Sequence, residues 1–222
     1  MRKLLFATAL LMLALSANAQ SPKASLHGTK EQPVAIIQTS MGDLHCVLFP
    51  KAAPLGTANF IGLAKGTTDW KDPKTGQTKH GVALYDNTTF HRVIPEFMIQ
   101  GGDPAGTGAG DIGLKFKNEN WPDLKFDRGG RLAYANAGKD TNGSQFFITE
   151  AATAFLNGNY TIFGQCDDAS VELVKKIARQ PRNRSDKPNT PIIIKHIKIE
   201  EGTAAKAPVK RSVIAGKAPV TR

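Results

Sequence analysis

Two segments of the sequence set a few polar side chains among bulky apolar ones. They are residues 90–103, FHRVIPEFMIQGGD, and residues 135–148, ANAGKDTNGSQFFI. Neither segment builds an activated nucleophile, a metal cage or a phosphate-binding loop. Such a mixture suits chemistry in which no covalent bond breaks, and rotation about a peptide bond is chemistry of that kind.

Other motifs that carry chemistry do not fit the sequence. The glycine-rich run at 106–110 lacks the third glycine of a dinucleotide fingerprint, because Asp111 stands at that position. Ser144 lies outside the GxSxG pattern of hydrolases. The five histidines show no metal-ligand spacing. We therefore interpret His91 as structural and expect no metal or other cofactor.

The two segments must be positioned by strands, which the alternation of apolar and polar residues predicts. Strands are expected at 34–39, 44–49, 89–94, 97–100, 131–136, 145–149, 161–166 and 192–199. Residues 67–87 are polar and rich in turn-forming pairs, which predicts a long surface loop.

Two helices complete the expected elements. Pro54 opens the first helix and Gly66 ends it, with an apolar face made of Leu55, Ala58, Ile61 and Leu63. The second helix spans roughly 168–179, with Asp168 as its N-cap. Many short strands and only two helices predict a closed antiparallel barrel or a sandwich.

The two ends of the chain differ from its middle. Residues 1–19 have the charged start, apolar run and small-residue site of a cleaved secretory signal, and the run is too short to span a bilayer. We expect residues 20–32 to be a polar leader and residues 201–222 to be a basic, disordered tail. Residues 1–19 and 201–222 carry six of the ten net positive charges, so no nucleic-acid partner is expected. The mature chain is predicted to be exported, to the periplasm or the medium, without a membrane span.

The two cysteines allow two interpretations. Cys46 and Cys166 could form a disulfide in an oxidising compartment. Each also lies in an apolar, strand-like setting, where a free cysteine behaves as a small hydrophobic residue. The sequence leaves both possibilities open.

The two polar–apolar segments resemble the signature blocks of the cyclophilin-type peptidyl-prolyl cis–trans isomerases. The resemblance covers residues 33–200, because Pro54–Phe60, Phe155-Leu156 and Phe163-Gly164 follow in the family's order. It implies a mainly β fold, a closed eight-stranded antiparallel β-barrel capped by two α-helices. It also implies acceleration of rotation about Xaa-Pro bonds in proline-containing polypeptides, which would assist the folding of exported proteins.

The resemblance also implies a role for each matching residue. Arg92 would donate a hydrogen bond to the prolyl nitrogen, while Gln100 and Asn136 would hold the substrate backbone. Gln145 would support Arg92 and Gln100, and Ala135 would form part of the floor. The residues expected to line the proline slot are Phe97, Met98, Phe147 and Leu156, with Phe155 and Tyr160 at its edge.

Three departures from the family pattern qualify these roles. Phe155 stands where many members have a tryptophan, and the loss of the indole N–H predicts weak binding of cyclosporin-type inhibitors. Tyr160 replaces a histidine found in many eukaryotic members. The 67–87 loop is longer than usual and offers an additional contact surface.

Two other classes of function compete with an enzyme. A proline-binding chaperone would use the same groove without needing turnover, although Arg92 favours the enzyme because binding alone needs the apolar slot more than the donor. An envelope-associated polymer binder would act through the tail and the 67–87 loop.

Overall fold

A computed structural model describes residues 32–201 of this protein. Buried and less buried residues alternate along its strands. In β1, for example, Ala35, Ile37 and Thr39 are buried and the residues between them are half-buried. The strands are β1 (Val34–Thr39), β2 (Gly42–Leu48), β3 (Trp70–Lys71), β4 (Thr78–Lys79), β5 (Thr88–Thr89), β6 (Arg92–Ile94), β7 (Met98–Gly101), β8 (Arg131–Tyr134), β9 (Phe146–Thr149), β10 (Ile162–Cys166) and β11 (Ile193–Glu200). The helices are α1 (Pro54–Lys65), α2 (Asp168–Ala178) and the short 3₁₀ helix η1 (Ala154–Leu156).

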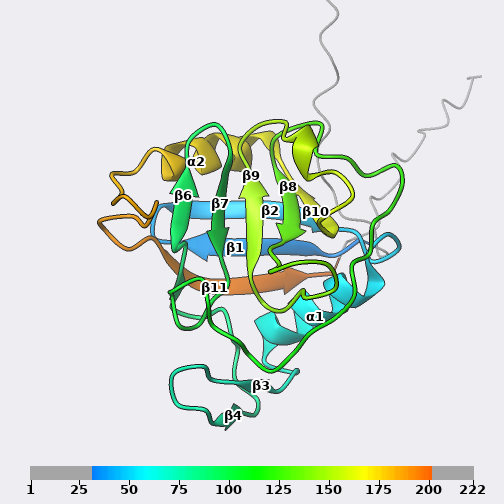
Figure 1. Cartoon of the computed structure of the whole chain (residues 1–222), viewed down its shortest axis with the longest axis vertical. Coiled ribbons are helices and arrows are strands. Elements are labelled where there is room, and N and C mark those ends of the chain that lie inside the picture. Colours follow the sequence, from blue (N-terminus) through cyan, green and yellow to red (C-terminus); the bar gives the residue numbers. More distant parts are fainter. Residues whose placement is uncertain (1–31, 202–222) are drawn as a thin grey trace, which may run out of the picture.

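Nine of the strands pair antiparallel in one sheet, in the order β5-β11-β1-β2-β10-β8-β9-β7-β6. The sheet folds over on itself, so that β6, β7, β8 and β9 cross in front of β1, β2 and β11 (Figure 1). Within residues 32–201 the fold is therefore mainly β with two α-helices, as predicted.

The predicted closed eight-stranded barrel is wrong in strand number and in closure. The hydrogen-bonded sheet has nine strands and two ends, β5 and β6. These end strands are separated in the chain only by Phe90 and His91, where the chain stops pairing with β11 and begins pairing with β7. The backbone N–H and C=O groups at Phe90 and His91 cannot pair with β11 and with β7 at once. The two ends of the sheet are therefore joined by the chain itself and not by a continuous ladder of hydrogen bonds.

The space between the two layers is filled by aromatic and branched side chains. Phe60 of α1 contacts Tyr85, Phe146 and Phe163, with ring centroids 5.0–5.6 Å apart. Helix α1 packs against β11, and α2 packs against β2 and β7. The core packs against the inner faces of the strands. The outer faces of the strands are therefore available for a site.

Helix α1 begins and ends where the sequence predicts, but only part of its predicted apolar face is buried. Gly66 adopts a left-handed conformation, with φ of 71°, and its N–H bonds to the Gly62 carbonyl. Leu55 and Ala58, predicted to be buried, are exposed, whereas Leu63 is fully buried as predicted and so is Phe60. Gly56 is buried instead, and the approach to the sheet is close there: a Cβ atom at Gly56 would lie 3.1 Å from the Tyr134 ring.

Helix α2 is capped one residue earlier than predicted. The carboxylate of Asp167, rather than that of Asp168, accepts a hydrogen bond from the Ser170 N–H at 2.8 Å. An N-cap side chain must stand outside the helical backbone to reach back to the N–H of the third residue, and Asp167 has that extended backbone.

The segment predicted to be an irregular loop, 67–87, contains the hairpin β3–β4. Trp70 pairs with Lys79 and Lys71 with Thr78. Trp70 is buried, and its indole N–H donates to the Val82 carbonyl at 2.9 Å. Turn-forming residues dominate the composition of this segment, and each of its two strands has only two residues. The alternation in the sequence is therefore too short to predict them.

The final strand, predicted at 192–199, spans Ile193–Glu200 and does not alternate regularly. Its register with β1 shifts between Gln38 and Thr39, which face His196 and Ile194. Lys195 is thereby left without an opposing residue in the ladder, so the buried residues Ile194 and Ile197 stand three apart.

Cys46 and Cys166 form a disulfide, which decides the question that the sequence left open. The two residues are directly opposed in β2 and β10, and both are buried. The bond joins two neighbouring strands across a sequence separation of 120 residues.

The predicted signal segment, most of the leader and the basic tail beyond residue 201 lie outside the described residues. Among residues 32–201, neither helix has the length and apolar character needed to cross a membrane.

Candidate active site

The pairing of four neighbouring strands brings residues of the predicted segments into one row. Arg92 of β6 lies opposite Gln100 of β7, Gln100 lies opposite Phe147 of β9, and Phe147 lies opposite Ala133 of β8. Directly opposed residues of antiparallel strands have their side chains on the same face, with Cβ atoms about 4.5–5.5 Å apart. The row therefore places a guanidinium, an amide and a phenyl ring side by side.

Alternation along these strands separates the row from the main core. Ile99, Phe146 and Ile148 are fully buried on the inner face. Successive side chains of a strand point to opposite faces, so Gln100 and Phe147 point outward. The period of two that makes the strands also directs the site residues away from the core.

An apolar cluster distinct from the main core lies along the row. Phe147 is its centre: its ring is stacked on that of Phe126 at 5.8 Å and meets the edge of Tyr160 at 5.5 Å. The buried members of the cluster are Met98, Phe126, Ala133, Phe147, Leu156 and Ile162, and Phe49, Ile94, Phe97, Leu124, Ala135 and Tyr160 pack against them. Six residues predicted to form the site, namely Phe97, Met98, Ala135, Phe147, Leu156 and Tyr160, thus meet in one cluster.

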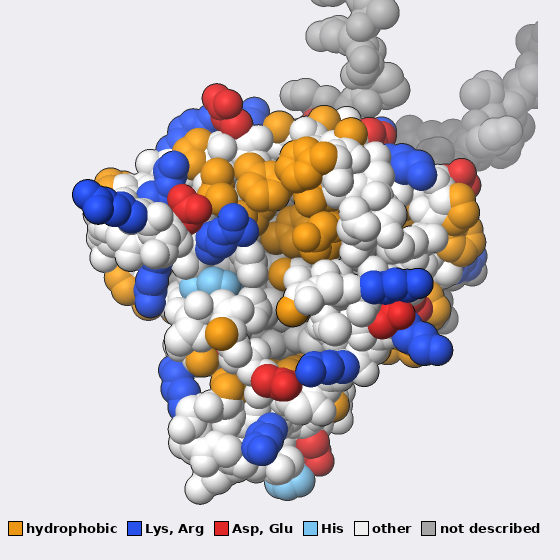
Figure 2. All heavy atoms as spheres, viewed as in Figure 1, with side chains coloured by type: hydrophobic (Ala, Val, Ile, Leu, Met, Phe, Trp, Pro, Cys, Tyr) orange, Lys and Arg blue, Asp and Glu red, His pale blue; other side chains and the backbone are white. Residues whose placement is uncertain are grey.

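Phe155 extends this cluster to the surface. Its side chain is 71% exposed, and its ring centroid is 5.5 Å from that of Phe97. Hydrophobic side chains gather on this face of the molecule around a hollow (Figure 2). A large exposed phenyl ring beside a buried apolar cluster is typical of a surface that receives an apolar ligand.

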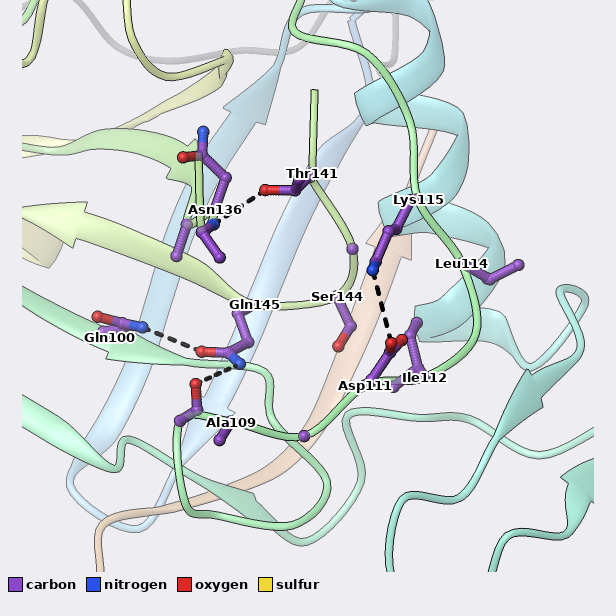
Figure 3. Close-up of a pocket in the computed structure, with 15 residues that line it drawn as sticks. Gln100, Ala109, Asp111, Ile112, Leu114, Lys115, Asn136, Thr141, Ser144 and Gln145 are labelled. Atoms are coloured by element: carbon purple, nitrogen blue, oxygen red, sulfur yellow. Dashed lines mark hydrogen bonds and ion pairs between the residues drawn. The ribbon is translucent and has the colours of Figure 1, made fainter. Parts of the chain in front are cut away.

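A chain of hydrogen bonds orders the polar half of the row. The Gln145 side-chain carbonyl accepts from the Gln100 amide at 3.0 Å, and the Gln145 amide donates to the Gly108 carbonyl at 3.0 Å (Figure 3). The Gln100 side-chain carbonyl in turn lies 3.5 Å from an Arg92 guanidinium nitrogen. Gln145 therefore bonds directly to Gln100, and Gln100 links it to Arg92.

Arg92 is held from a second side by an acidic residue. Its side chain is 43% exposed, and its Nε lies 3.9 Å from the carboxylate of Asp186. The Asp186 carbonyl also accepts a hydrogen bond from the Val93 N–H at 2.8 Å. The guanidinium is thus held near the apolar cluster while part of it stays accessible.

A polar pocket of about 320 Å³ adjoins the row. Gln100 and Gln145 line one side of it, and the ion pair of Asp111 and Lys115, at 3.7 Å, lies on the opposite side (Figure 3). Asn136 also lines the pocket, and its side-chain amide donates to the Asn159 carbonyl at 3.1 Å. The predicted backbone-holding residues therefore border a hollow large enough for side chains of a bound peptide.

The segment that closes this pocket is ordered by a buried carboxylate. Asp103 is fully buried and accepts hydrogen bonds from the backbone N–H groups of Ala105, Thr107, Gly108 and Gly110, at 2.7–3.3 Å. Burial alone would raise the pKa of Asp103, but these N–H groups outweigh it and lower the pKa. The carboxylate therefore stays ionised and fixes Gly108, the partner of Gln145.

His91 lies beneath the same segment. It is buried, and within residues 32–201 neither ring nitrogen has a hydrogen-bond partner. A Cβ atom at Gly108 would lie 3.3 Å from its Nε2. Burial lowers the pKa of His91, partly offset by the charge of Asp103. The ring is therefore neutral and fills space under the loop.

Two contributors to the site were missed by the sequence analysis. Phe126 stacks on Phe147 from an irregular, polar stretch in which no period marks it. Asp186 reaches Arg92 from a connection remote in sequence. No local signal pointed to either residue. Within the described part of the chain, no three His, Cys, Asp or Glu side chains come together as metal ligands.

Comparison with known proteins agrees with this geometry. The family model described as "Cyclophilin type peptidyl-prolyl cis-trans isomerase/CLD" matches residues 34–199. Peptidyl-prolyl cis-trans isomerase B of Streptomyces anulatus is 46% identical over 172 residues, covering 77% of this chain and 98% of the relative. Peptidyl-prolyl cis-trans isomerase A of Mycobacterium tuberculosis is 47% identical over 166 residues, covering 74% of this chain and 91% of the relative.

Solved structures give the same result. The crystal structure of a cyclophilin type peptidyl-prolyl cis-trans isomerase of Cryptosporidium parvum is similar with a TM-score of 0.65 at 38% identity, covering 76% of this chain and 98% of that chain. A structure of that protein in the presence of the dipeptide Ala-Pro matches with a TM-score of 0.63 at 39% identity, covering 75% and 98%. The chain belongs to the cyclophilin-type peptidyl-prolyl cis–trans isomerases.

Proposed function

We propose that this protein accelerates cis–trans rotation about Xaa-Pro peptide bonds in polypeptides. The observation that carries the proposal is the row in which Arg92 and Gln100 stand beside Phe147 and its apolar cluster. Membership of the isomerase family supports it. The Ala-Pro dipeptide present with the similar Cryptosporidium parvum protein supports proline-containing peptides as substrates.

The physics of the reaction explains why a guanidinium beside an apolar cluster suits it. Rotation about the bond passes through a twisted amide, at a barrier of about 18–20 kcal/mol. In that state the prolyl nitrogen recovers its lone pair and becomes a hydrogen-bond acceptor, while the amide loses dipole. A donor at the nitrogen and an apolar surround therefore favour the twisted state over the planar one, and each tenfold in rate needs about 1.4 kcal/mol of this preference.

Each side of the row has a role in this mechanism. The proline ring packs on the cluster of Phe97, Met98, Phe147 and Leu156, with Phe155 and Tyr160 at its edge. Arg92 donates to the prolyl nitrogen, and its guanidinium stays charged because the pKa of arginine is above about 12.

The backbone beside the proline is held at the polar pocket. Gln100 and Asn136 hold it, Ala135 forms part of the floor, and Gln145 keeps Gln100 in place. This divides the site into an apolar half that binds the ring and a polar half that holds the chain.

Removal of the Arg92 donor tests the mechanism. We expect Arg92→Ala to lower kcat/KM for an Xaa-Pro peptide by about 10²- to 10³-fold, the usual loss for one transition-state donor. Arg92→Lys should be intermediate, because an ammonium keeps the charge but is held less rigidly. Arg128→Ala is the matched control, since Arg128 is exposed and its guanidinium pairs with Asp127 and not with a residue of the row.

The same variants separate an enzyme from a proline-binding chaperone. If the protein is an enzyme, Arg92→Ala should weaken peptide binding by less than about threefold. The rate of rotation about the Xaa-Pro bond should fall by a much larger factor than the affinity. Equal activity of Arg92→Ala and wild type, both folded, would refute the role of Arg92.

We further propose that the protein is exported, most simply to the periplasm, and assists the folding of exported proteins there. The secretory pattern of residues 1–19 supports export. The buried disulfide supports it as well, because such bonds persist in oxidising compartments. Osmotic-shock fractionation checks the location: the mature chain should be released, whereas a chain starting at residue 20 should stay in the cytoplasm. Retention of the full-length protein in the cytoplasm would contradict export.

Weak cyclosporin binding is part of the same proposal. Phe155 offers a ring at the edge of the cluster but no N–H donor. Phe155→Trp should tighten the binding of cyclosporin, measured as inhibition of the rotation of an Xaa-Pro peptide. An unchanged affinity for cyclosporin would show that Phe155 is not the cause of weak binding.

A further inference from the structure

A second cleft lies beside the polar pocket and is not used by the mechanism above. It has a volume of about 680 Å³ and lies between residues 71–76 of the β3–β4 hairpin and residues 105–113. We call it the hairpin cleft. Figure 1 shows the hairpin standing off the sheet at one end of the molecule.

The hairpin cleft continues from the polar pocket. Ala109, Gly110 and Asp111 line both hollows, so one segment forms their common wall. On the far side of the polar pocket stand Gln100 and Gln145 of the row. The hairpin cleft is therefore next to the polar pocket, and a chain that is held at Gln100 and crosses residues 109–111 reaches it.

Both walls of the cleft are fixed before any ligand arrives. The wall at 105–110 is held by the four backbone hydrogen bonds to Asp103. The Lys71 N–H donates to the Ile112 carbonyl at 2.9 Å, which joins the hairpin to this wall, and buried Trp70 anchors the hairpin beneath. A preformed cleft binds with little ordering of the protein, so contacts there contribute to affinity.

The charged side chains that line the hairpin cleft are Lys71, Lys74, Asp72 and Asp111, and each of the two carboxylates is paired with a lysine from outside the lining. Asp72 lies 3.7 Å from Lys79, and Asp111 lies 3.7 Å from Lys115. Lys71 and Lys74 are exposed and have no ion-pair partner within residues 32–201. Acidic side chains complement this arrangement.

We propose that the hairpin cleft binds the substrate polypeptide on one side of its proline and favours acidic residues there. This inference rests on the proposed function and adds to it a preference at a distance from the reacting bond. The test uses a short Xaa-Pro core peptide and versions lengthened by five residues, before or after the core, with glutamate or with glutamine.

We expect a glutamate extension on one of the two sides to raise kcat/KM about three- to fivefold over its glutamine counterpart at low salt, from two exposed charge contacts. The gain should vanish near 1 M salt, where the Debye length falls to about 3 Å. Lys71→Gln/Lys74→Gln should abolish the gain and leave the core peptide unaffected. The control Lys176→Gln/Lys195→Gln removes the same charge from exposed positions of α2 and β11 and should keep it.

The outcomes separate this inference from the proposed function. If wild type accelerates the core peptide but gains nothing from glutamate on either side, the inference is overturned alone. An equal gain in Lys71→Gln/Lys74→Gln and wild type also overturns it. If wild type fails to accelerate even the core peptide, the proposed function fails and the inference with it.

Discussion

The disulfide between Cys46 and Cys166 allows a stability prediction worked from the structure. It joins two residues 120 apart in sequence. Cross-linking a loop of that length removes about 16 cal/mol/K of entropy from the unfolded chain, or about 5 kcal/mol at 25 °C. Measured values for such bonds are typically about 2–4 kcal/mol. Since both sulfur atoms are buried among apolar residues, the reduced thiols still fit as small hydrophobic groups.

We therefore expect reduction to lower the free energy of unfolding by about 2–5 kcal/mol. In a domain of this size, the melting temperature should fall by roughly 5–15 °C. Because the bond is buried, reductant must be added in denaturant before refolding. Intact mass then verifies the redox state, and urea titration measures stability. The bond lies outside the active-site row, so kcat/KM at low temperature should be unchanged.

Cys46→Ala/Cys166→Ala is the control, because reductant should not alter its stability. A reduced wild type within about 1 kcal/mol of the oxidised protein would refute the loop-entropy reasoning. Intact mass showing free thiols in protein purified from the periplasm would refute the bond itself.

Three further predictions concern the site. Gln145→Ala removes two hydrogen bonds that hold Gln100 and Gly108, each worth about 0.5–1.5 kcal/mol, and should lower kcat/KM about 5- to 150-fold without altering the fold by circular dichroism. Asp103→Asn should destabilise the protein by about 1.5–3 kcal/mol in urea, because the loop N–H groups lose a charged acceptor; an unchanged urea midpoint would contradict this. Since burial lowers the pKa of His91, the unfolded state binds more protons below about pH 6.5, so stability should fall as the pH drops through that range. His91→Gln should flatten this part of the urea-midpoint profile, and superimposable profiles for variant and wild type would exclude His91 as the cause.

Local patterns in the sequence determined much of this protein. Alternation predicted the strands that carry Arg92, Gln100 and Phe147, and Pro54 and Gly66 marked the ends of α1. The resemblance of the two segments to the signature blocks of the family indicated the family and the roles of Arg92, Gln100 and Phe147. These features are local because the period of a strand and the conformational freedom of glycine act within a few residues.

Tertiary structure decided what depends on pairing between remote segments. Register alone set Arg92 opposite Gln100 and Gln100 opposite Phe147. The change of partners at Phe90 and His91 replaced the expected closed barrel with a nine-stranded sheet. Asp186 beside Arg92 and the hairpin cleft also arise from long-range contacts. A sequence states which face of a strand each residue takes, but only the folded chain determines which residues that face meets, because those partners come from anywhere along the chain.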